Sequence, residues 1–177
     1  MATLLLIRHG ETDWNAEHRW QGHADVPLNA RGREQAKALA EELAPEGIDA
    51  IYASDLSRAR DTAEMVGERL GVPVVLDPDL REIDVGSREG LTGDEVGDRP
   101  WDGEPREAHG ERILRAVRGI AERHPGQRVA VVSHGGSLRR IQEHLDAELD
   151  DWFGNCSVWA LAHESGSFRP VEDYTGK

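Results

Sequence analysis

Cationic and imidazole side chains recur in this sequence at points where apolar segments end. The apolar run Leu4–Ile7 is followed directly by Arg8 and His9, and a second apolar run ends immediately before Ser133 and His134. Burying an arginine or a histidine is costly unless a polar or charged partner compensates for the lost water. Because a guanidinium group matches the geometry of phosphate and carboxylate oxygens, these residues predict an anion held at the strand ends.

Two further short apolar segments are also followed by charged residues. Arg58 is expected in the first turn of a helix that follows a short apolar strand, and Glu82 follows an arginine after a third such strand. Gly135 and Gly136 follow His134, where the backbone N–H groups of a helix start could bind an anion. Each feature alone has an ordinary structural explanation, such as a surface arginine or a tight turn. Their joint occurrence at successive strand ends favours one shared site.

The elements that must position these residues alternate between strands and helices. Strands are predicted at Thr3–Arg8, Asp49–Ser54, Val72–Leu76, Val129–Ser133, Asn155–Ala162 and Ser167–Val171. Helices are predicted at Ala30–Leu43, Leu56–Leu70, Glu111–Arg123 and Leu138–Leu145, from helical spacing of apolar residues and from capping residues. This alternation predicts an α/β fold: a three-layer α/β/α sandwich with a mostly parallel central sheet and helices on both faces. Such sheets bind ligands beyond the carboxyl ends of their strands.

A single domain spanning residues 1–177 is expected, because a chain of 177 residues has room for one sizeable core. Residues 85–109 contain several glycines, two prolines and many charges, with no periodic apolar pattern. This composition predicts a short lid-like excursion from the domain. The sequence leaves the oligomeric state open, with a homodimer among the alternatives.

The formal net charge of −13 argues against nucleic acid or an anionic membrane as a partner. It also means that a compact group of cations must overcome a repulsive field if the substrate is an anion. The single cysteine, Cys156, excludes an internal disulfide framework, and it is expected to be a small buried core residue. With no apolar run long enough to span a bilayer and no signal-peptide pattern, a cytoplasmic protein is expected.

The same residues resemble the signature of a known family. Five blocks, in family order, are similar to those of the histidine phosphatase superfamily, the phosphoglycerate mutase-like proteins. They are Arg8–Thr12 with Trp14 and Asn15, Gly22–Leu28, Ser54–Ala59, Leu80–Glu82 and Ser133–Gly136. One such block would be a weak signal, but five ordered blocks covering most of the chain are specific.

The resemblance implies that His9 is a nucleophile that becomes transiently phosphorylated. A neutral imidazole nitrogen can attack at neutral pH without a separate base, provided that its other nitrogen is held by a fixed acceptor. Arg8, Arg58 and a protonated His134 would neutralise the transferring phosphoryl group, and Asn15 would donate a neutral hydrogen bond. No metal and no other cofactor is implied.

Glu82 is the candidate general acid and base. A carboxyl group beside a phosphate is favoured in its protonated form, so it could protonate the leaving oxygen and later accept a proton from water. By resemblance, Gln21, Gly22 and Gly135 line the substrate site. Trp20 and Trp101 could flank the substrate, although ordinary packing would explain both. These expectations describe a metal-independent, acid-type phosphatase that acts on small phosphomonoesters.

Two alternatives stay open at this point. A cofactor-dependent phosphoglycerate mutase would need extra cations, and the family's mutases typically have Arg-His-Tyr-Gly after the catalytic glutamate. This chain has Ile83-Asp84-Val85-Gly86 there, which favours a phosphatase. A non-catalytic phospho-ligand binding protein is the other alternative, and the presence of His9, Glu82 and His134 argues against it.

Overall fold

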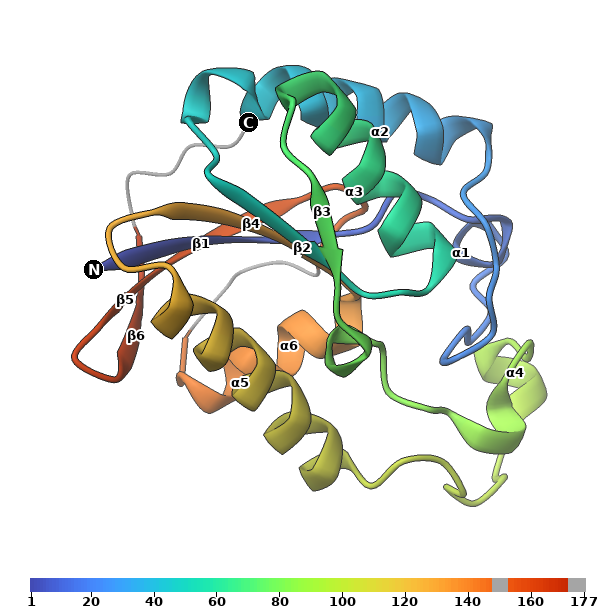
Figure 1. Cartoon of the computed structure of the whole chain (residues 1–177). Helices are drawn as coiled ribbons and strands as arrows, with labels where there is room; N and C mark the ends of the chain where they lie inside the picture. The colour runs from blue at the N-terminus through green and yellow to red at the C-terminus, as the bar shows by residue number, and fades with distance from the viewer. Residues whose placement is uncertain (148–152, 172–177) are drawn as a thin grey trace.

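The computed structural model describes residues 1–147 and 153–171. Within this part of the chain, six strands form one sheet in the order β3-β2-β4-β1-β5-β6 (Figure 1). The strands are β1 (Ala2–Arg8), β2 (Ala50–Ala53), β3 (Val74–Leu76), β4 (Arg128–Ser133), β5 (Val158–Glu164) and β6 (Ser167–Pro170).

The sheet confirms the predicted α/β class. Strands β3, β2, β4 and β1 run parallel, whereas β5 pairs antiparallel with β1, and β6 pairs antiparallel with β5. The β5–β6 hairpin turns at Ser165 and Gly166, both of which have positive φ angles. Serine-glycine between two apolar segments is a hairpin signal that could have predicted this antiparallel pair.

Helices cover both faces of the sheet (Figure 1). On one face lie α2 (Ala30–Leu43) and α3 (Ser57–Leu70), and on the other lie α5 (Arg106–Arg123) and α6 (Gly135–His144). The side chains of β1 alternate between the two cores: Leu5 packs with α2 and α3, while Leu4 packs with α5 and α6. Because both faces of this central strand are buried, its sequence is continuously apolar.

Several predicted boundaries differ from the structure. Helix α5 begins at Arg106, five residues before the predicted Glu111, so the lid-like excursion expected at 85–109 ends at Pro105. Helix α6 begins at Gly135 rather than Leu138, because His134 takes the N-cap position and both glycines are helical. Residues 155–157 do not belong to β5: they form a turn in which Cys156 has a φ of 59°.

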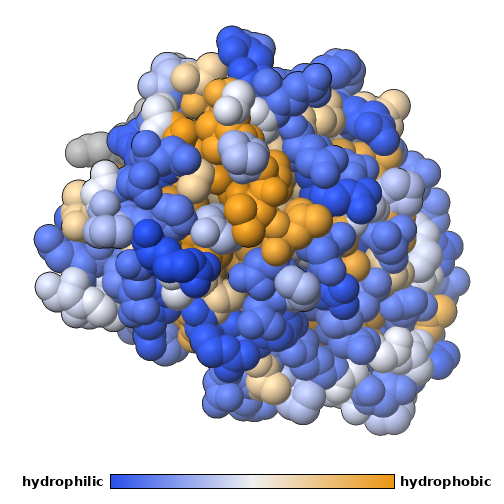
Figure 2. All heavy atoms as spheres, viewed as in Figure 1, coloured by the Kyte–Doolittle hydropathy of each residue, from blue (hydrophilic) through white to orange (hydrophobic). Residues whose placement is uncertain are grey.

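The excursion contains short helical segments, among them α4 (Gly93–Val96), and it packs against the loop that follows α1 (Asp13–Ala16). Backbone hydrogen bonds join Trp20 to Leu91 and Gly90 to Trp20. Strand β3 lies at one edge of the sheet and exposes Val75 and Leu76. Hydrophobic residues gather at the centre of the face that carries β3 (Figure 2). Among the described residues, no helix is both long and apolar enough to cross a membrane.

Candidate active site

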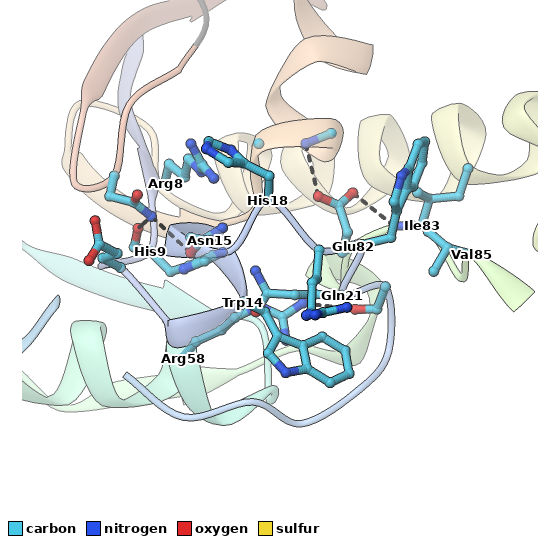
Figure 3. Close-up of a pocket in the computed structure, with 17 residues that line it drawn as sticks. Arg8, His9, Trp14, Asn15, His18, Gln21, Arg58, Glu82, Ile83 and Val85 are labelled. Atoms are coloured by element: carbon cyan, nitrogen blue, oxygen red, sulfur yellow. Dashed lines mark hydrogen bonds between the residues drawn. The ribbon is translucent and has the colours of Figure 1, made fainter. Parts of the chain in front are cut away.

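A cavity of about 530 Å³ opens at the carboxyl ends of β1 and β4 (Figure 3). Its wall contains every predicted site residue except His134: Arg8, His9, Asn15, Gln21, Gly22, Arg58, Glu82 and Gly135. The two strands align so that Arg8 is the register partner of Ser133, and the His9 N–H donates to the Ser133 carbonyl. This register brings residues that are far apart in the sequence to one edge of the sheet.

His9 is oriented by its own loop. Its Nδ1–H donates to the Gly10 carbonyl at 2.6 Å, which leaves Nε2 as the ring nitrogen available for reaction. The Gly10 N–H in turn donates to Thr62 Oγ1 at 3.0 Å, which ties this loop to α3. Burial lowers the pKa of His9 well below its usual value, and the nearby charges of Arg58 and Arg8 lower it further. The ring is therefore neutral at neutral pH, as a nucleophile must be.

Arg58 is almost completely buried, although it is charged. Its two terminal nitrogens donate to the carbonyls of Ala24 and Gly22 at 2.7 and 2.8 Å, while its Nε, also buried, has no hydrogen-bond partner among the described residues. Burial lowers its pKa to about 10, so the side chain stays cationic at neutral pH. Gly22 has a φ of +52°, and a Cβ atom there would lie 2.6 Å from a methyl group of Val85. Glycine at this position permits the turn that presents its carbonyl to Arg58.

Arg8 reaches the cavity from the end of β1, and its Nη1 donates to the Phe153 carbonyl at 2.6 Å. Burial lowers its pKa, whereas the charge of Glu82 raises it. A Cβ atom at Gly135 would lie 3.2 Å from Arg8 Nε. The first glycine of α6 therefore leaves room for the guanidinium group.

His134 lies beside His9 but is not part of the cavity wall. The two ring centroids are 5.2 Å apart, and His134 Nε2 is hydrogen-bonded to Ser54 Oγ at 2.9 Å. Burial lowers the pKa of His134 well below its usual value, and Arg58 is the next largest cause. The cationic form expected from the sequence therefore depends on an anion bound at this site.

Glu82 is held by backbone donors. Its Oε2 accepts the Gly136 N–H at 2.9 Å, and its Oε1 accepts the Ile83 N–H at 2.9 Å. This corrects one sequence expectation, because the Gly136 N–H was expected to bind the anion and instead fixes the candidate acid. A Cβ atom at Gly136 would lie 2.5 Å from Glu82 Oε1, so glycine allows this close approach.

A second group of contacts clamps the loop that carries Glu82. The guanidinium group of Arg112, on α5, donates to the carbonyls of Asp79, Arg81 and Glu82 and forms an ion pair with Glu104. In the same loop, Arg81 forms a two-bond ion pair with Asp55, with both distances 2.6 Å. Arg81, the arginine that precedes Glu82 in the sequence, is therefore bound to a carboxylate and is not part of the cavity wall.

Behind Glu82, a buried histidine and a serine form a polar pair that the mechanism does not require. His109 Nε2 lies 2.9 Å from Ser137 Oγ and 3.9 Å from Glu82 Oε1. Because the Ser137 hydroxyl donates to the Arg81 carbonyl at 3.1 Å, it accepts a hydrogen bond from His109. Burial lowers the pKa of His109, which favours the neutral ring in this position.

Asn15 and Gln21 each have one amide oxygen already engaged. Asn15 Oδ1 accepts from the Thr12 N–H and from Asn155 Nδ2, and Gln21 Oε1 accepts from Thr12 Oγ1 at 2.8 Å. Their amide nitrogens are therefore the groups available to a substrate oxygen. The predicted donor role of Asn15 would use this amide nitrogen. Asn155, which sequence reasoning missed, also donates to the His9 carbonyl at 3.0 Å.

Other residues of the wall were not predicted from the sequence as part of the site: Glu11, Trp14, His18, Arg19, Ile83, Val85 and Asn155. Most belong to loops whose path has no periodic signal. Trp20 does line the cavity, as suggested, whereas Trp101 packs behind it with ring centroids 6.5 Å apart. Cys156 is half-buried at the edge of one core, and burial raises the pKa of its thiol to about 12.

This arrangement suits transfer of a phosphoryl group. It offers a neutral imidazole, two guanidinium groups, two amide donors and one carboxyl group on the wall of a single cavity. Within residues 1–147 and 153–171, no three histidine, cysteine, aspartate or glutamate side chains gather in a way that could hold a metal ion. The imidazole, guanidinium and carboxyl groups on the wall can supply nucleophilic attack, cationic stabilisation and proton transfer.

Comparison with known proteins agrees with this geometry. Residues 4–173 match the family model described as histidine phosphatase superfamily (branch 1). The chain is 38% identical over 161 residues to phosphoglycerate mutase-like protein 4 of Arabidopsis thaliana, a match that covers 80% of this chain and 70% of that protein. It is 41% identical over 157 residues to metal-independent phosphoserine phosphatase of the same plant, covering 78% of this chain and 66% of that protein.

A solved structure has a similar fold. Mycobacterial glucosyl-3-phosphoglycerate phosphatase, determined with VO₃, superposes with a TM-score of 0.85 at 31% sequence identity. The superposition covers 95% of this chain and 96% of that one. The similar proteins thus include both phosphatases and a mutase-like protein, and their names do not decide between the two activities.

Proposed function

The chain belongs to the histidine phosphatase superfamily, and from that premise we propose that it hydrolyses phosphomonoesters of small metabolites through a phosphorylated His9. The observation that supports this most directly is the hydrogen bond from His9 Nδ1 to the Gly10 carbonyl. It fixes the tautomer that leaves Nε2 unprotonated, on a cavity wall shared with Arg8 and Arg58.

The reaction has two steps. In the first, His9 Nε2 attacks phosphorus and the bond to the ester oxygen breaks, while a protonated Glu82 transfers its proton to that oxygen. In the second, Glu82 accepts a proton from water as the water oxygen attacks phosphohistidine, which releases phosphate and restores the imidazole. Arg8 and Arg58 balance the charge on the equatorial oxygens, and a cationic His134 beside His9 adds to them.

The cavity favours a phosphatase over a mutase. Ile83 and Val85 place apolar side chains on the wall just beyond Glu82, where a mutase would need cations for a carboxylate and a second phosphate. Asp84, between them, accepts the Gly86 N–H at 2.9 Å. A 3-phosphoglycerate assay with added bisphosphoglycerate tests the mutase alternative directly, because a mutase would form 2-phosphoglycerate without net phosphate release.

The His9→Ala substitution is the test of the nucleophile. Phosphate release from p-nitrophenyl phosphate should fall at least ~10³-fold, since the nucleophile itself is removed. The acid-labile phosphohistidine that the parent protein forms in rapid-quench experiments should also disappear. His144→Ala, which changes an exposed histidine on α6, is the matched control and should keep both signals. Turnover retained in His9→Ala would refute the proposal.

Three further expectations belong to this proposal and stay predictions. A small phosphomonoester is the partner, with neither nucleic acid nor membrane involved. A cytoplasmic location fits the single cysteine. A homodimer stays one of the assemblies to test.

A further inference from the structure

The cavity is much larger than a phosphate group requires, and its two ends differ in chemistry. At one end lie His9, Arg8, Arg58 and Glu82, which handle the phosphoryl group. The rest of the wall includes Trp14, Arg19, Trp20, Ile83 and Val85, and we call this part the leaving-group chamber. In Figure 3, Ile83 and Val85 are drawn beyond Glu82, on the opposite side of the view from Arg8. The chamber must therefore receive the alcohol part of the ester.

Two indole rings give the chamber an apolar surface that is firmly supported. The Trp14 ring packs against Gly90, where a Cβ atom would lie 3.2 Å from it. The Trp20 ring is backed by Trp101, and the guanidinium carbon of Arg88 lies 5.7 Å from the Trp20 ring centroid and 5.2 Å from that of Trp101. Rings held in this way are suited to contact a flat or ring-shaped group without reorganisation.

Arg19, the arginine on this part of the cavity wall, is already paired with two carboxylates. Arg19 pairs with Glu17 at 2.6 Å and with Glu95 at 2.9 Å, and it also donates to the Gly90 carbonyl at 2.8 Å. A carboxylate on the leaving group would have to displace one of these partners. It would also enter the field of a protein whose net charge is −13.

We propose, building on the phosphatase activity proposed above, that the leaving-group chamber selects phosphomonoesters of uncharged, ring-bearing alcohols over esters whose alcohol carries a carboxylate or a second phosphate. The indoles of Trp14 and Trp20 contact the ring, and the Arg19–Glu95 ion pair withholds the positive charge that an anionic leaving group would need. Stripping water from an unpaired carboxylate then reduces its binding.

Binding of stable phosphonates tests this selection without requiring turnover. Benzylphosphonate and 4-carboxybenzylphosphonate differ only by the carboxylate, and calorimetry at pH 7.5 should show at least tenfold weaker binding of the carboxylated compound. Equal or tighter binding of the carboxylated compound would overturn the proposal. Trp14→Leu and Trp20→Leu should each lower the affinity ratio of benzylphosphonate to methylphosphonate at least about fivefold. An unchanged ratio in both variants would contradict the proposed contact between the indoles and the ring of the alcohol.

The Glu95→Gln substitution tests the effect of the Arg19–Glu95 ion pair. In Glu95→Gln the amide oxygen can still accept the Thr92 N–H, but the negative charge beside Arg19 is gone. The affinity of 4-carboxybenzylphosphonate relative to benzylphosphonate should rise at least about threefold. Glu34→Gln is the control, because this substitution changes the net charge by the same amount. Glu34 is exposed and pairs with Lys37. A ratio that does not move in Glu95→Gln, or that moves equally in the control, contradicts the ion-pair mechanism.

Phosphate release from phenyl phosphate, measured in parallel, separates this inference from the proposed function. Normal phosphonate selectivity without phosphate release would contradict the phosphatase activity while leaving the chamber assignment standing. Phosphate release with no discrimination against the carboxylate would contradict the chamber assignment alone.

Discussion

The side chains of His9, Arg8 and Arg58 influence one another before any substrate binds. The hydrogen bond to the Gly10 carbonyl selects the tautomer of His9, and burial together with the two arginine charges lowers its pKa. The same two guanidinium groups face the cavity in which the phosphoryl group would lie. One pair of charges therefore both keeps the nucleophile unprotonated and attracts the electrophile, which explains why arginines stand beside a histidine at the end of a buried strand.

The Glu82→Gln substitution tests proton donation at the level of a single residue. The amide keeps the size of the carboxyl group but cannot protonate a leaving alkoxide, so kcat for an alkyl ester should fall about 10²–10³-fold. For p-nitrophenyl phosphate, whose leaving group needs little protonation, the loss should be about tenfold or less. Glu107→Gln, at an exposed position on α5, provides the control. Equal losses for both esters would show that Glu82 is not the proton donor.

At the level of secondary-structure elements, the start of α6 determines where Glu82 lies. Gly136 is the second residue of this helix, and its N–H donates to Glu82 Oε2. The absence of a side chain at Gly136 lets the carboxyl group approach the helix backbone closely. A sequence of two glycines after a histidine, which could have been a simple turn, is here a helix start shaped to hold a carboxyl group.

Gly136→Ala should therefore impair catalysis more than stability. The new Cβ atom would lie 2.5 Å from Glu82 Oε1, and the end of a side chain can move away, so kcat for an alkyl ester should fall about 10–100-fold. Gly110→Ala on α5 is the matched control, since a Cβ atom there meets nothing within 4 Å. That variant should keep its activity and gain about 0.5–1 kcal/mol of helix stability. Equal activity of the two variants in the alkyl ester assay would contradict the role of α6.

The residues at the strand ends were the part of the site that could best be predicted from the sequence. Each joins an apolar run to a polar residue, and parallel pairing fixes which ends share an edge, so Arg8 and His134 could be placed in advance. The leaving-group chamber could not be predicted, because Trp14 on the short helix α1 and Val85 in a loop are brought to one cavity only by tertiary contacts. Helix α5 begins earlier than predicted for a related reason. His109 in its first turns is polar but fully buried, and it interrupts the apolar pattern.

Across the whole molecule, buried neutral histidines link the site to stability. His9, His134 and His109 are all buried, and burial lowers the pKa of each. A folded protein that keeps such groups unprotonated must give up binding protons that its unfolded chain accepts. The arrangement that keeps the nucleophile reactive should therefore make the unliganded protein sensitive to mild acid.

This sensitivity has a defined direction. Because the pKa values of these histidines lie below about 6.5 in the folded state, the unfolded chain binds more protons once the pH falls below that value. The free energy of unfolding should then decrease as the pH falls from about 6.5 to 5, by at most about 1.4 kcal/mol per histidine per pH unit. Urea denaturation at several pH values measures this slope.

His109→Gln isolates one of the three contributions. Glutamine can still donate to Ser137 but does not titrate, so the slope of unfolding free energy against pH should be shallower by the share of one histidine, whatever the variant's absolute stability. Carboxylates with lowered pKa values, such as that of Asp55, lose their contribution only in more acidic solution and leave this window clear. A flat profile between pH 6.5 and 5 would mean that these rings titrate in the folded protein as they do in the unfolded chain. Burial and the arginine charges would then not be what keeps His9 neutral.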